Sequence, residues 1–361
     1  MLGTRAVASP VRTDTIDSGA SAEARSAPSA ALPQSKNPDT PVVLVLGSAG
    51  LVGRYLGWQL ERDGYEVLHV YNRTHVDLRV PGALEAYVGD RRVDFCFFLA
   101  CEVGGSKFLE NKDTNIQLDI VEHNVAIYQQ VLPFLRNRRI PFLFSSSYLQ
   151  AQPSPYGTIK RLGEAWIRAQ RWGKIVRFWN IYGEERIGLK SHVIQDWTSS
   201  CVAKGKIQAA TDGYEQRQFL HARDLAQALV LLMRAYDQIP DPAVSSIDAI
   251  DVSGGEWTPL RRVADIIQSE ARKLGVVEKG ATGDLTDSTL PDNATSRDTC
   301  DVVFSDRRAM FRTKINPNMK TLLYNDLNWT PVVTMEEGIR ELLLHAKAIA
   351  DADATVASPH P

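Results

Sequence analysis

The feature that most constrains this chain is an apolar strand followed at once by three evenly spaced glycines. Val42–Leu46 is a continuous apolar run of strand length, as expected for a parallel strand that is buried on both faces. Gly47, Gly50 and Gly53 follow in a GxxGxxG pattern, and residues 51–61 then read as a helix. Between a strand and a helix, such glycines permit a tight turn and a close backbone approach to a pyrophosphate. The pattern therefore predicts a dinucleotide site at the start of this helix.

Further apolar strands and helical stretches alternate after this unit. Alternation at such spacing indicates βαβ units and therefore an α/β fold with a Rossmann-type, doubly wound parallel sheet. Strands are predicted over residues 66–71, 93–100, 140–144 and 174–179, with helices over 117–136 and 158–170. Looser helical stretches are predicted near 191–203, 222–235, 258–273 and 335–348, and residues 277–303 read as a long loop.

Composition along the chain predicts its division into segments. Residues 1–40 are rich in Ala, Ser, Pro and Thr without apolar periodicity, which predicts a disordered tail. Three arginines there would suit a transit peptide, but Asp14, Asp17 and Glu23 argue against one. We expect a Rossmann domain over 41–180 with 217–252 contributing, a smaller C-terminal α/β domain over 181–216 and 253–350, and a tail over 351–361.

Charge and cysteine content exclude several classes of function. The formal net charge is -2 at pH 7 and is spread along the chain, which argues against nucleic-acid and membrane partners. No apolar run approaches the ~20 residues that a membrane-spanning helix needs. The four cysteines form no CxxC pair and have no histidine at metal-ligand spacing. We therefore expect no metal site and a reducing, cytoplasmic compartment.

A second group of polar residues predicts proton-transfer chemistry. The run Ser145–Ser147 follows the strand predicted over 140–144, at the carboxyl edge where such sheets bind ligands. Tyr156 and Lys160 come next, at i and i+4 on one face of a predicted helix. An ammonium lowers the pKa of a nearby phenol from about 10 toward neutrality. Tyr156 could then exchange a proton with a carbinol oxygen while a hydride moves to or from a nicotinamide.

The end of the second predicted strand bears on which dinucleotide binds. A carboxylate there would hold the ribose 2′-hydroxyl of NAD, but the chain carries Tyr71, Asn72 and Arg73. Arg73 could pair with a 2′-phosphate, which favours NADP over NAD, and a solvated surface arginine is the alternative. Asp77 and Leu78 follow at a position where an acid could contact the adenine.

A series of motifs resembles one known family in content and order. The glycine loop, the serine run and Tyr156-x-x-x-Lys160 are followed by Val176–Gly183 and Asp212–Asp224, then by Leu327–Pro331 and Glu336–Arg340. From about residue 41 to 347 the chain resembles the extended short-chain dehydrogenase/reductases that act on nucleotide sugars. The resemblance implies an NAD(P) cofactor, a nucleotide-sugar substrate bound by the C-terminal domain, and a homodimer built on the helices over 117–136 and 158–170.

The resemblance also implies a role for individual residues. Catalytic roles are implied for Ser147 (favoured over Ser146), Tyr156, Lys160 and His192. Cofactor contacts are implied for Gly47, Ala49, Gly50, Leu51, Val52, Gly53, Arg73, Asp77, Leu78, Leu99, Ala100, Tyr156 and Lys160. Substrate contacts are implied for Asn124, which resembles the structural asparagine of the family's proton relay, and for Asn180 and Arg217. The guanidinium of Arg217 suits a substrate phosphate, and a surface salt bridge is the alternative.

The residues after Ser147 bear on the reaction. The family's dehydratases place an acid there to eliminate water, whereas this chain has Tyr148–Gln150, which argues against dehydration. Ser191–Ile194 resembles a segment of GDP-fucose synthase in which a histidine is an acid/base for epimerisation, and Ala100–Gly105 resembles that enzyme's loop beside the nicotinamide. That enzyme also uses a cysteine just after the serine, which is absent here. His192 would then perform a single proton transfer, or only pack at the pocket wall.

Three interpretations remain open. One is a reductase of a 4-keto sugar nucleotide that uses NADPH, with or without a single epimerisation, and Arg73 and the synthase-like segments favour it. The second is a nucleotide-sugar 4-epimerase that keeps NAD bound and returns the hydride to the opposite face. The third belongs to another class, a dinucleotide-sensing module without catalysis. Relatives of that kind usually lack the Tyr or the Lys, and both are present here.

Overall fold

The computed structural model describes residues 39–244, 249–276, 300–308 and 321–357. Nearly all of the predicted N-terminal tail, and most of the loop predicted over 277–303, lie outside these residues. Within the described part of the chain, no helix combines the length and apolarity that crossing a membrane requires.

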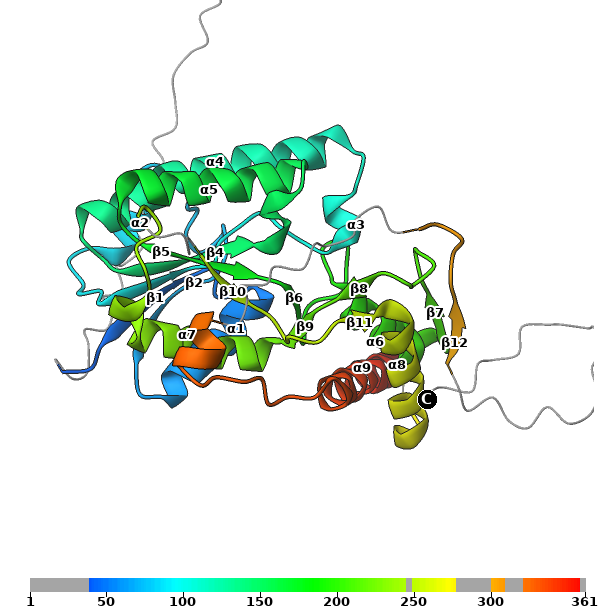
Figure 1. The fold of residues 1–361 in the computed structure, drawn as a ribbon. Helices are drawn as coiled ribbons and strands as arrows, with labels where there is room; N and C mark the ends of the chain where they lie inside the picture. The colour runs from blue at the N-terminus through cyan, green and yellow to red at the C-terminus, as the bar shows by residue number, and fades with distance from the viewer. Residues whose placement is uncertain (1–38, 245–248, 277–299, 309–320, 358–361) are drawn as a thin grey trace, which may run out of the picture. The chain divides into compact units, whose positions relative to one another are not determined.

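A six-stranded parallel sheet forms the centre of the fold (Figure 1). In spatial order its strands are β10 (Ile250–Val252), β5 (Lys174–Phe178), β4 (Phe142–Ser147), β3 (Phe95–Phe98), β1 (Val42–Leu46) and β2 (Glu66–Val70). The strand order reverses at β1, because β2 lies on one side of it and β3 on the other. This confirms the predicted Rossmann-type, doubly wound sheet.

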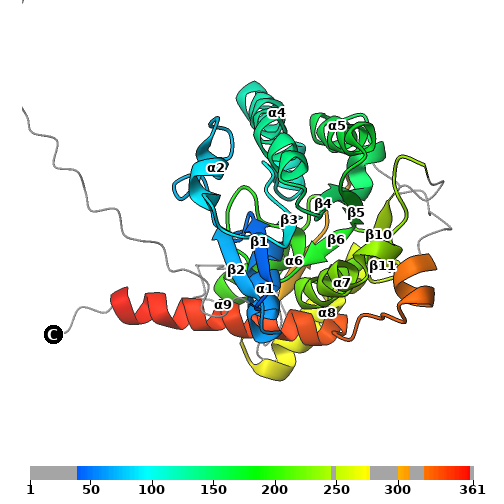
Figure 2. The ribbon, with the colours of Figure 1, turned by 90° about the vertical axis from the view of Figure 1, so that its left-hand side faces the viewer.

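Alternate residues of β1 face opposite sides of the sheet and contact different helices, as the period of a strand requires. Val42, Leu44 and Leu46 pack in the apolar cluster that includes side chains of α2, α4 and α5. Val43 and Val45 pack in the cluster that includes α1 and α7. Figure 2 shows the two helical layers on the two faces of the sheet. The helices are α1 (Leu51–Arg62), α2 (Ala83–Val88), α4 (Thr114–Asn137), α5 (Pro155–Gln170) and α7 (Ala222–Arg234).

Shorter elements extend beyond the carboxyl edge of the sheet. They include three two-stranded pairs, β6 with β9, β7 with β12 and β8 with β11. Helices α6, α8 and α9 supply most of a third apolar cluster. The elements are α3 (Ser106–Leu109), β6 (Asn180–Tyr182), α6 (Val193–Lys204), β7 (Lys206–Gln208), β8 (Gln216–Arg217), β9 (Phe219–His221), β11 (Thr258–Pro259), α8 (Leu260–Leu274), β12 (Asp301–Val303) and α9 (Met335–Ala357), with single-turn helices η1 (Tyr148–Ala151), η2 (Tyr236–Gln238) and η3 (Thr321–Asp326). The predicted domain boundaries stay a prediction.

Two segments differ from what the sequence predicted. The tail predicted over 351–361 is wrong in its first part, because α9 continues to Ala357 through a segment rich in alanine, the best helix former. The loop predicted over 277–303 ends in a strand, because β12 pairs with β7 in parallel. There the Asp301 N–H donates to the Gly205 carbonyl at 2.8 Å. A contact distant in sequence decides the second outcome, and local composition does not reveal it.

A buried histidine links β9 to the helices around it. The ring of His221 is 1% exposed and packs edge-on against Tyr55 and Tyr182, with ring centroids 5.6 and 5.1 Å away. Its Nδ1 accepts the backbone N–H of Arg223 at 3.2 Å, and its Nε2 lies 3.7 Å from the Glu341 carboxylate on α9. Burial lowers the pKa of His221 to about 4, so the ring is neutral at pH 7.

This histidine predicts a loss of stability in mild acid. Unfolded histidine titrates near pH 6.5. The stabilisation from a neutral His221 is therefore complete above that pH and is lost as the pH falls toward 4. His221→Asn keeps an acceptor for the Arg223 N–H but does not titrate. Urea unfolding should show that the variant loses less stability than the native chain between pH 7.5 and 4.5, by up to about 3 kcal/mol. Equal losses in both proteins would contradict this account.

Candidate active site

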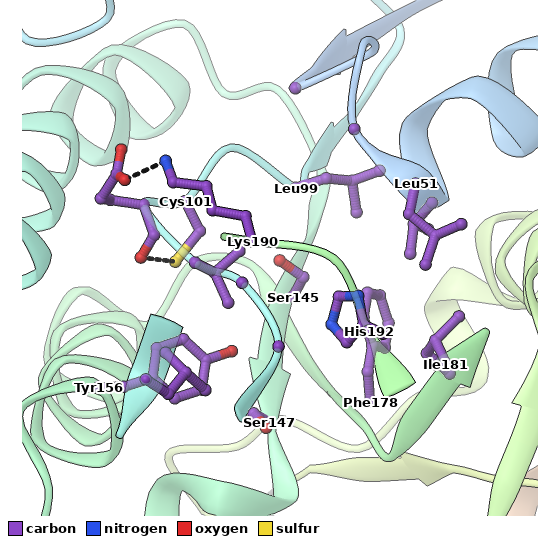
Figure 3. A pocket seen from close by; sticks show the side chains of 18 of the residues that line it. Leu51, Leu99, Cys101, Ser145, Ser147, Tyr156, Phe178, Ile181, Lys190 and His192 are labelled. Carbon is purple, nitrogen blue, oxygen red and sulfur yellow. Dashed lines mark hydrogen bonds and ion pairs between the residues drawn. The ribbon is translucent and has the colours of Figure 1, made fainter. Parts of the chain in front are cut away.

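A cavity of about 830 Å³ lies at the carboxyl edge of the sheet. Its wall is built from the glycine loop, the loops after β2, β3 and β4, the start of α5, β6, β8 and the loop before α6. In Figure 3 the side chains of Tyr156 and His192 approach it from opposite sides, with Ser147 at the end of β4 between them. The predicted residues that line the cavity are Gly47, Ala49, Gly50, Leu51, Val52, Gly53, Arg73, Asp77, Leu78, Leu99, Ala100, Ser147, Tyr156, Lys160, Asn180, His192 and Arg217.

The glycine loop has the close approaches that the sequence predicted. Gly47 has a φ of +91°, and a Cβ there would lie 2.9 Å from the backbone nitrogen of Ala100. A Cβ on Gly53 would lie 2.2 Å from the carbonyl oxygen of Gly47. Gly50 is the N-cap of α1 and has no side chain to cap the helix. The first turn of α1 therefore presents backbone N–H groups and a positive helix end to the cavity, which fits a bound pyrophosphate.

The serine run divides between the two faces of β4, because successive side chains of a strand alternate. All three serines line the cavity, and the Ser147 hydroxyl lies near the Tyr156 phenol. The hydroxyl of Ser146 donates to the carboxylate of Glu164 at 2.6 Å, where both side chains are buried. This geometry supports Ser147, and not Ser146, as the serine that touches a substrate oxygen.

Lys160 reaches β4 from the same face of α5 as Tyr156. It is 3% exposed, and its Nζ donates to the carbonyl oxygen of Ser145 at 2.6 Å. The Nζ lies 5.6 Å from the centroid of the Tyr156 ring. Burial raises the pKa of Tyr156 well above its usual range, and the neighbouring Ser147 hydroxyl opposes only part of that rise. The prediction that Lys160 brings this pKa toward neutrality is therefore wrong for this structure, because burial dominates.

A buried carboxylate beneath the site is compensated by two arginines. Glu164 is 2% exposed, and Arg177 donates to it from Nε at 2.8 Å and from Nη2 at 2.6 Å. Arg168 donates to the same carboxylate at 2.8 Å. Burial raises the pKa of Glu164, but these hydrogen bonds and that of Ser146 outweigh it and leave the pKa below its usual value. The carboxylate is charged and fully engaged, so it holds α5 against β4 and β5.

Asn124 does not lie where the sequence predicted. It is fully buried in α4 and is absent from the cavity wall. Its Oδ1 accepts the Glu102 N–H at 2.8 Å, and its Nδ2 donates to the carbonyl oxygens of Glu102 and Ile120 at 3.1 and 2.7 Å. The structure corrects the substrate contact implied for Asn124, which instead fixes the loop after β3.

His192 stands at the start of α6 and is held by a carboxylate that the sequence did not reveal. Its Nδ1 lies 2.9 and 3.0 Å from the two carboxylate oxygens of Glu185, and its backbone N–H donates to Glu185 at 2.6 Å. Glu185 also lines the cavity. With Nδ1–H donating to this carboxylate, Nε2 is the nitrogen that can exchange a proton. An acid seven residues before the histidine was the only sequence signal for this pair.

A close loop contact sets the position of His192. The Gly105 N–H donates to the Lys190 carbonyl at 2.8 Å, and a Cβ on Gly105 would lie 2.3 Å from the Ser191 carbonyl oxygen. Lys190 also forms an ion pair with Glu102. The loop after β3 therefore rests directly on the loop before α6, and it joins the dinucleotide side of the cavity to the histidine side.

The other predicted cofactor and substrate contacts lie at the two ends of the cavity. Arg73 is exposed and lines the end nearer β2. Asp77 is engaged by the Arg79 guanidinium at 2.6 and 2.9 Å, which lowers the pKa of its carboxyl to about 2. Arg217 has a half-buried side chain and lies 3.9 Å from Glu215, too far for a hydrogen bond. Among the described residues, no group of His, Cys, Asp and Glu side chains is arranged to hold a metal ion.

Residues 43–247, more than half of the chain, match the family described as the NAD dependent epimerase/dehydratase family. The chain belongs to this family. An NAD(P) cofactor and an enzymatic function follow from membership, and the uncapped α1 N-terminus in the cavity fits such a cofactor.

Individual relatives are more distant. A putative GDP-L-fucose synthase 2 of Oryza sativa subsp. japonica is 23% identical over 334 residues, which covers 83% of this chain and 85% of the relative. A GDP-L-fucose synthetase from Naegleria fowleri bound to NADP superposes with a TM-score of 0.64 at 17% identity, covering 88% and 97% of the two chains. UDP-glucose 4-epimerase of Thermotoga maritima with UDP-glucose superposes with a TM-score of 0.61 at 16% sequence identity, covering 86% of this chain and 99% of that one. These structural likenesses show the fold and do not separate reductase from epimerase.

The two serines offer a matched test of the site. Ser147→Ala removes the hydroxyl that contacts Tyr156, so kcat should fall about 100-fold or more with little change in stability. Ser146→Ala instead removes a hydrogen bond to a buried carboxylate, which should cost about 1–3 kcal/mol of unfolding free energy and leave kcat within about threefold. Steady-state kinetics and urea unfolding of both variants separate the roles. The reverse pattern would show that the serines have been assigned the wrong way round.

Proposed function

We propose that this enzyme reduces a 4-keto sugar nucleotide with NADPH, and that His192 performs one epimerisation beside the carbonyl. The observation that carries the proposal is that Ser147 and a protonated Tyr156 both line the cavity, with His192 on the opposite side. A neutral phenol is the form that can give a proton to a carbonyl oxygen, which is the direction of a reduction. The GDP-fucose synthases and NADP-bound neighbour among the similar proteins agree with this proposal.

The residues of the cavity divide the chemistry between them. When bound, the nicotinamide supplies the hydride. Ser147 orients the carbonyl oxygen and Tyr156 protonates it as the carbinol forms. The charged Lys160, held by the Ser145 carbonyl, stabilises negative charge that develops on the phenol. Water exclusion around the buried Tyr156 strengthens each of these interactions.

His192 supplies one further proton transfer in this proposal. Its Nε2 can remove a proton from a carbon beside the carbonyl, because the resulting imidazolium is stabilised by Glu185. A proton from solvent then returns to the opposite face of that carbon, which inverts it. Tyr148 and Leu149 follow Ser147 in place of an acid or a cysteine, and both line the cavity. Burial raises the pKa of Tyr148, which disfavours this phenol as a base. Epimerisation at a single carbon therefore fits these residues better than epimerisation at two carbons or a dehydration.

NADP is the proposed cofactor because of the charge at the end of β2. Arg73 lines the cavity beside Asn72 and carries the positive charge that a 2′-phosphate requires. No carboxylate ends β2 itself, and the nearby Asp77 is already engaged by Arg79. A nucleotide-sugar 4-epimerase that retains NAD is the alternative outcome, and Arg73 would then face solvent.

Isotope labelling tests both steps in one product. With NADPH deuterated at the transferable position, reduction of a GDP- or dTDP-linked 4-keto-6-deoxy sugar in ordinary water should place one deuterium on the former carbonyl carbon. With unlabelled NADPH in deuterium oxide, one carbon-bound deuterium should appear at the neighbouring carbon. Mass spectrometry and proton NMR of the isolated product measure both positions.

Variants separate the two steps. Tyr156→Phe should abolish both labels, because the carbonyl oxygen loses its proton donor. His192→Asn should lose only the solvent-derived label and keep the one from NADPH. Two solvent-derived deuteriums on carbon would contradict the single exchange, and a product without cofactor-derived deuterium would contradict the reduction.

A further inference from the structure

The residue immediately after Ser147 is a tyrosine that contacts the substrate side of the cavity. Tyr148 begins η1 and lines the cavity. Its ring stacks on Trp179, with centroids 4.8 Å apart and planes 15° apart. Trp179 is fixed in turn, because its Nε1 donates to the Asp251 carboxylate at 2.9 Å and its ring meets the edge of Trp257 at 5.7 Å. The stacked Trp179 ring, which Asp251 and Trp257 hold in place, therefore fixes the position of the Tyr148 ring.

The hydroxyl of Tyr148 donates to Oδ1 of Asn180 at 3.1 Å. An asparagine amide has two orientations that exchange its donor and acceptor ends. With its oxygen toward Tyr148, the Asn180 Nδ2 also donates to the Gln218 carbonyl at 3.4 Å. One Nδ2 hydrogen then remains for an acceptor in the cavity, which Asn180 lines. The two contacts therefore select the orientation in which Asn180 is a hydrogen-bond donor to a ligand.

The surroundings support a ligand that carries acceptor oxygens. Burial raises the pKa of Tyr148, so the phenol stays protonated and continues to donate to Asn180. Arg217 lies close enough to favour the charged form of this phenol, and it faces the same cavity. A guanidinium beside an amide donor matches the oxygens of a diphosphate or of a sugar.

We propose that Tyr148 is a positioning residue, which holds Asn180 as a donor toward the diphosphate or sugar oxygens of a nucleotide sugar. This inference rests on the proposed function for the class of substrate, but it assigns a task to a residue outside the Ser147–Tyr156–Lys160 group. Tyr148 acts through Asn180 and takes no part in proton transfer. Its loss should weaken substrate binding and leave the chemical step unchanged.

Tyr148→Phe tests the inference, because it keeps the ring that stacks on Trp179 and removes the hydroxyl. Calorimetric titration of the NADP-loaded protein uses UDP-glucose and GDP-mannose as probes. Affinity for the probe that binds should fall about 3- to 10-fold, the worth of one neutral hydrogen bond. KM for a turned-over substrate should rise by a similar factor with kcat within about twofold. Tyr65→Phe is the matched control, since its hydroxyl accepts from Arg234 outside the cavity wall, and it should bind normally.

A double-mutant cycle with Asn180→Ala distinguishes positioning from packing. Tyr148→Phe should have no further effect on affinity once Asn180 is truncated, because the two residues act as one unit. Additive losses, unchanged affinity in Tyr148→Phe alone, or a fall confined to kcat would each overturn the inference. Wild-type protein that binds neither probe would contradict the proposed function itself, and the inference would fall with it. Wild-type protein that binds a probe as tightly as Tyr148→Phe does would overturn the inference alone.

Discussion

The candidate active site depends on one stripe of α5 that is hydrogen-bonded to the end of β4 through Lys160 and Glu164. Tyr156, Lys160 and Glu164 follow one another at intervals of four and so share a helical face. Tyr156 lies near Ser147, Lys160 hydrogen-bonds with the Ser145 carbonyl, and Glu164 hydrogen-bonds with Ser146. Glu164 is the anchor of this stripe, because Arg177 on β5 and Arg168 neutralise its buried charge. Removing one partner of such a buried pair costs about 3–5 kcal/mol, so α5 is held firmly in register.

This anchor gives the two ends of the stripe different tasks. Glu164, at the inner end, fixes the helix in a buried, charged cluster. Tyr156, at the outer end, presents its phenol to the cavity. The glycine loop presents helix N–H groups to the same cavity, because the carboxyl ends of β1 and β4 meet at one edge of the sheet. His192 comes from beyond the sheet and is placed by the contact of Gly105 with its loop. The glycine loop, the Tyr156 phenol and the His192 imidazole thus line one cavity although they come from distant parts of the chain.

Much of this arrangement could be predicted from the sequence, where the signal was local. The strand at 42–46, the glycine spacing and the four-residue interval between Tyr156 and Lys160 depend on backbone geometry within a few residues. Contacts between distant segments could not be read in the same way. The partnership of Glu185 with His192 and that of Tyr148 with Asn180 appear only when the loops are folded. The pKa of Tyr156 differs from the prediction because burial, which the sequence does not state, raises it.

The central claim is that NADPH is consumed as a substrate and is not retained as a recycled group. Mass analysis of any nucleotide released from a freshly purified, heat-denatured sample tests this, together with titration of a separate native sample with NADPH and NADH. We expect little retained cofactor and tighter binding of NADPH than of NADH, with the preference reduced in Arg73→Ala because the 2′-phosphate loses its cation. Stoichiometric NAD that survives purification would contradict the account and would identify a 4-epimerase that returns its own hydride.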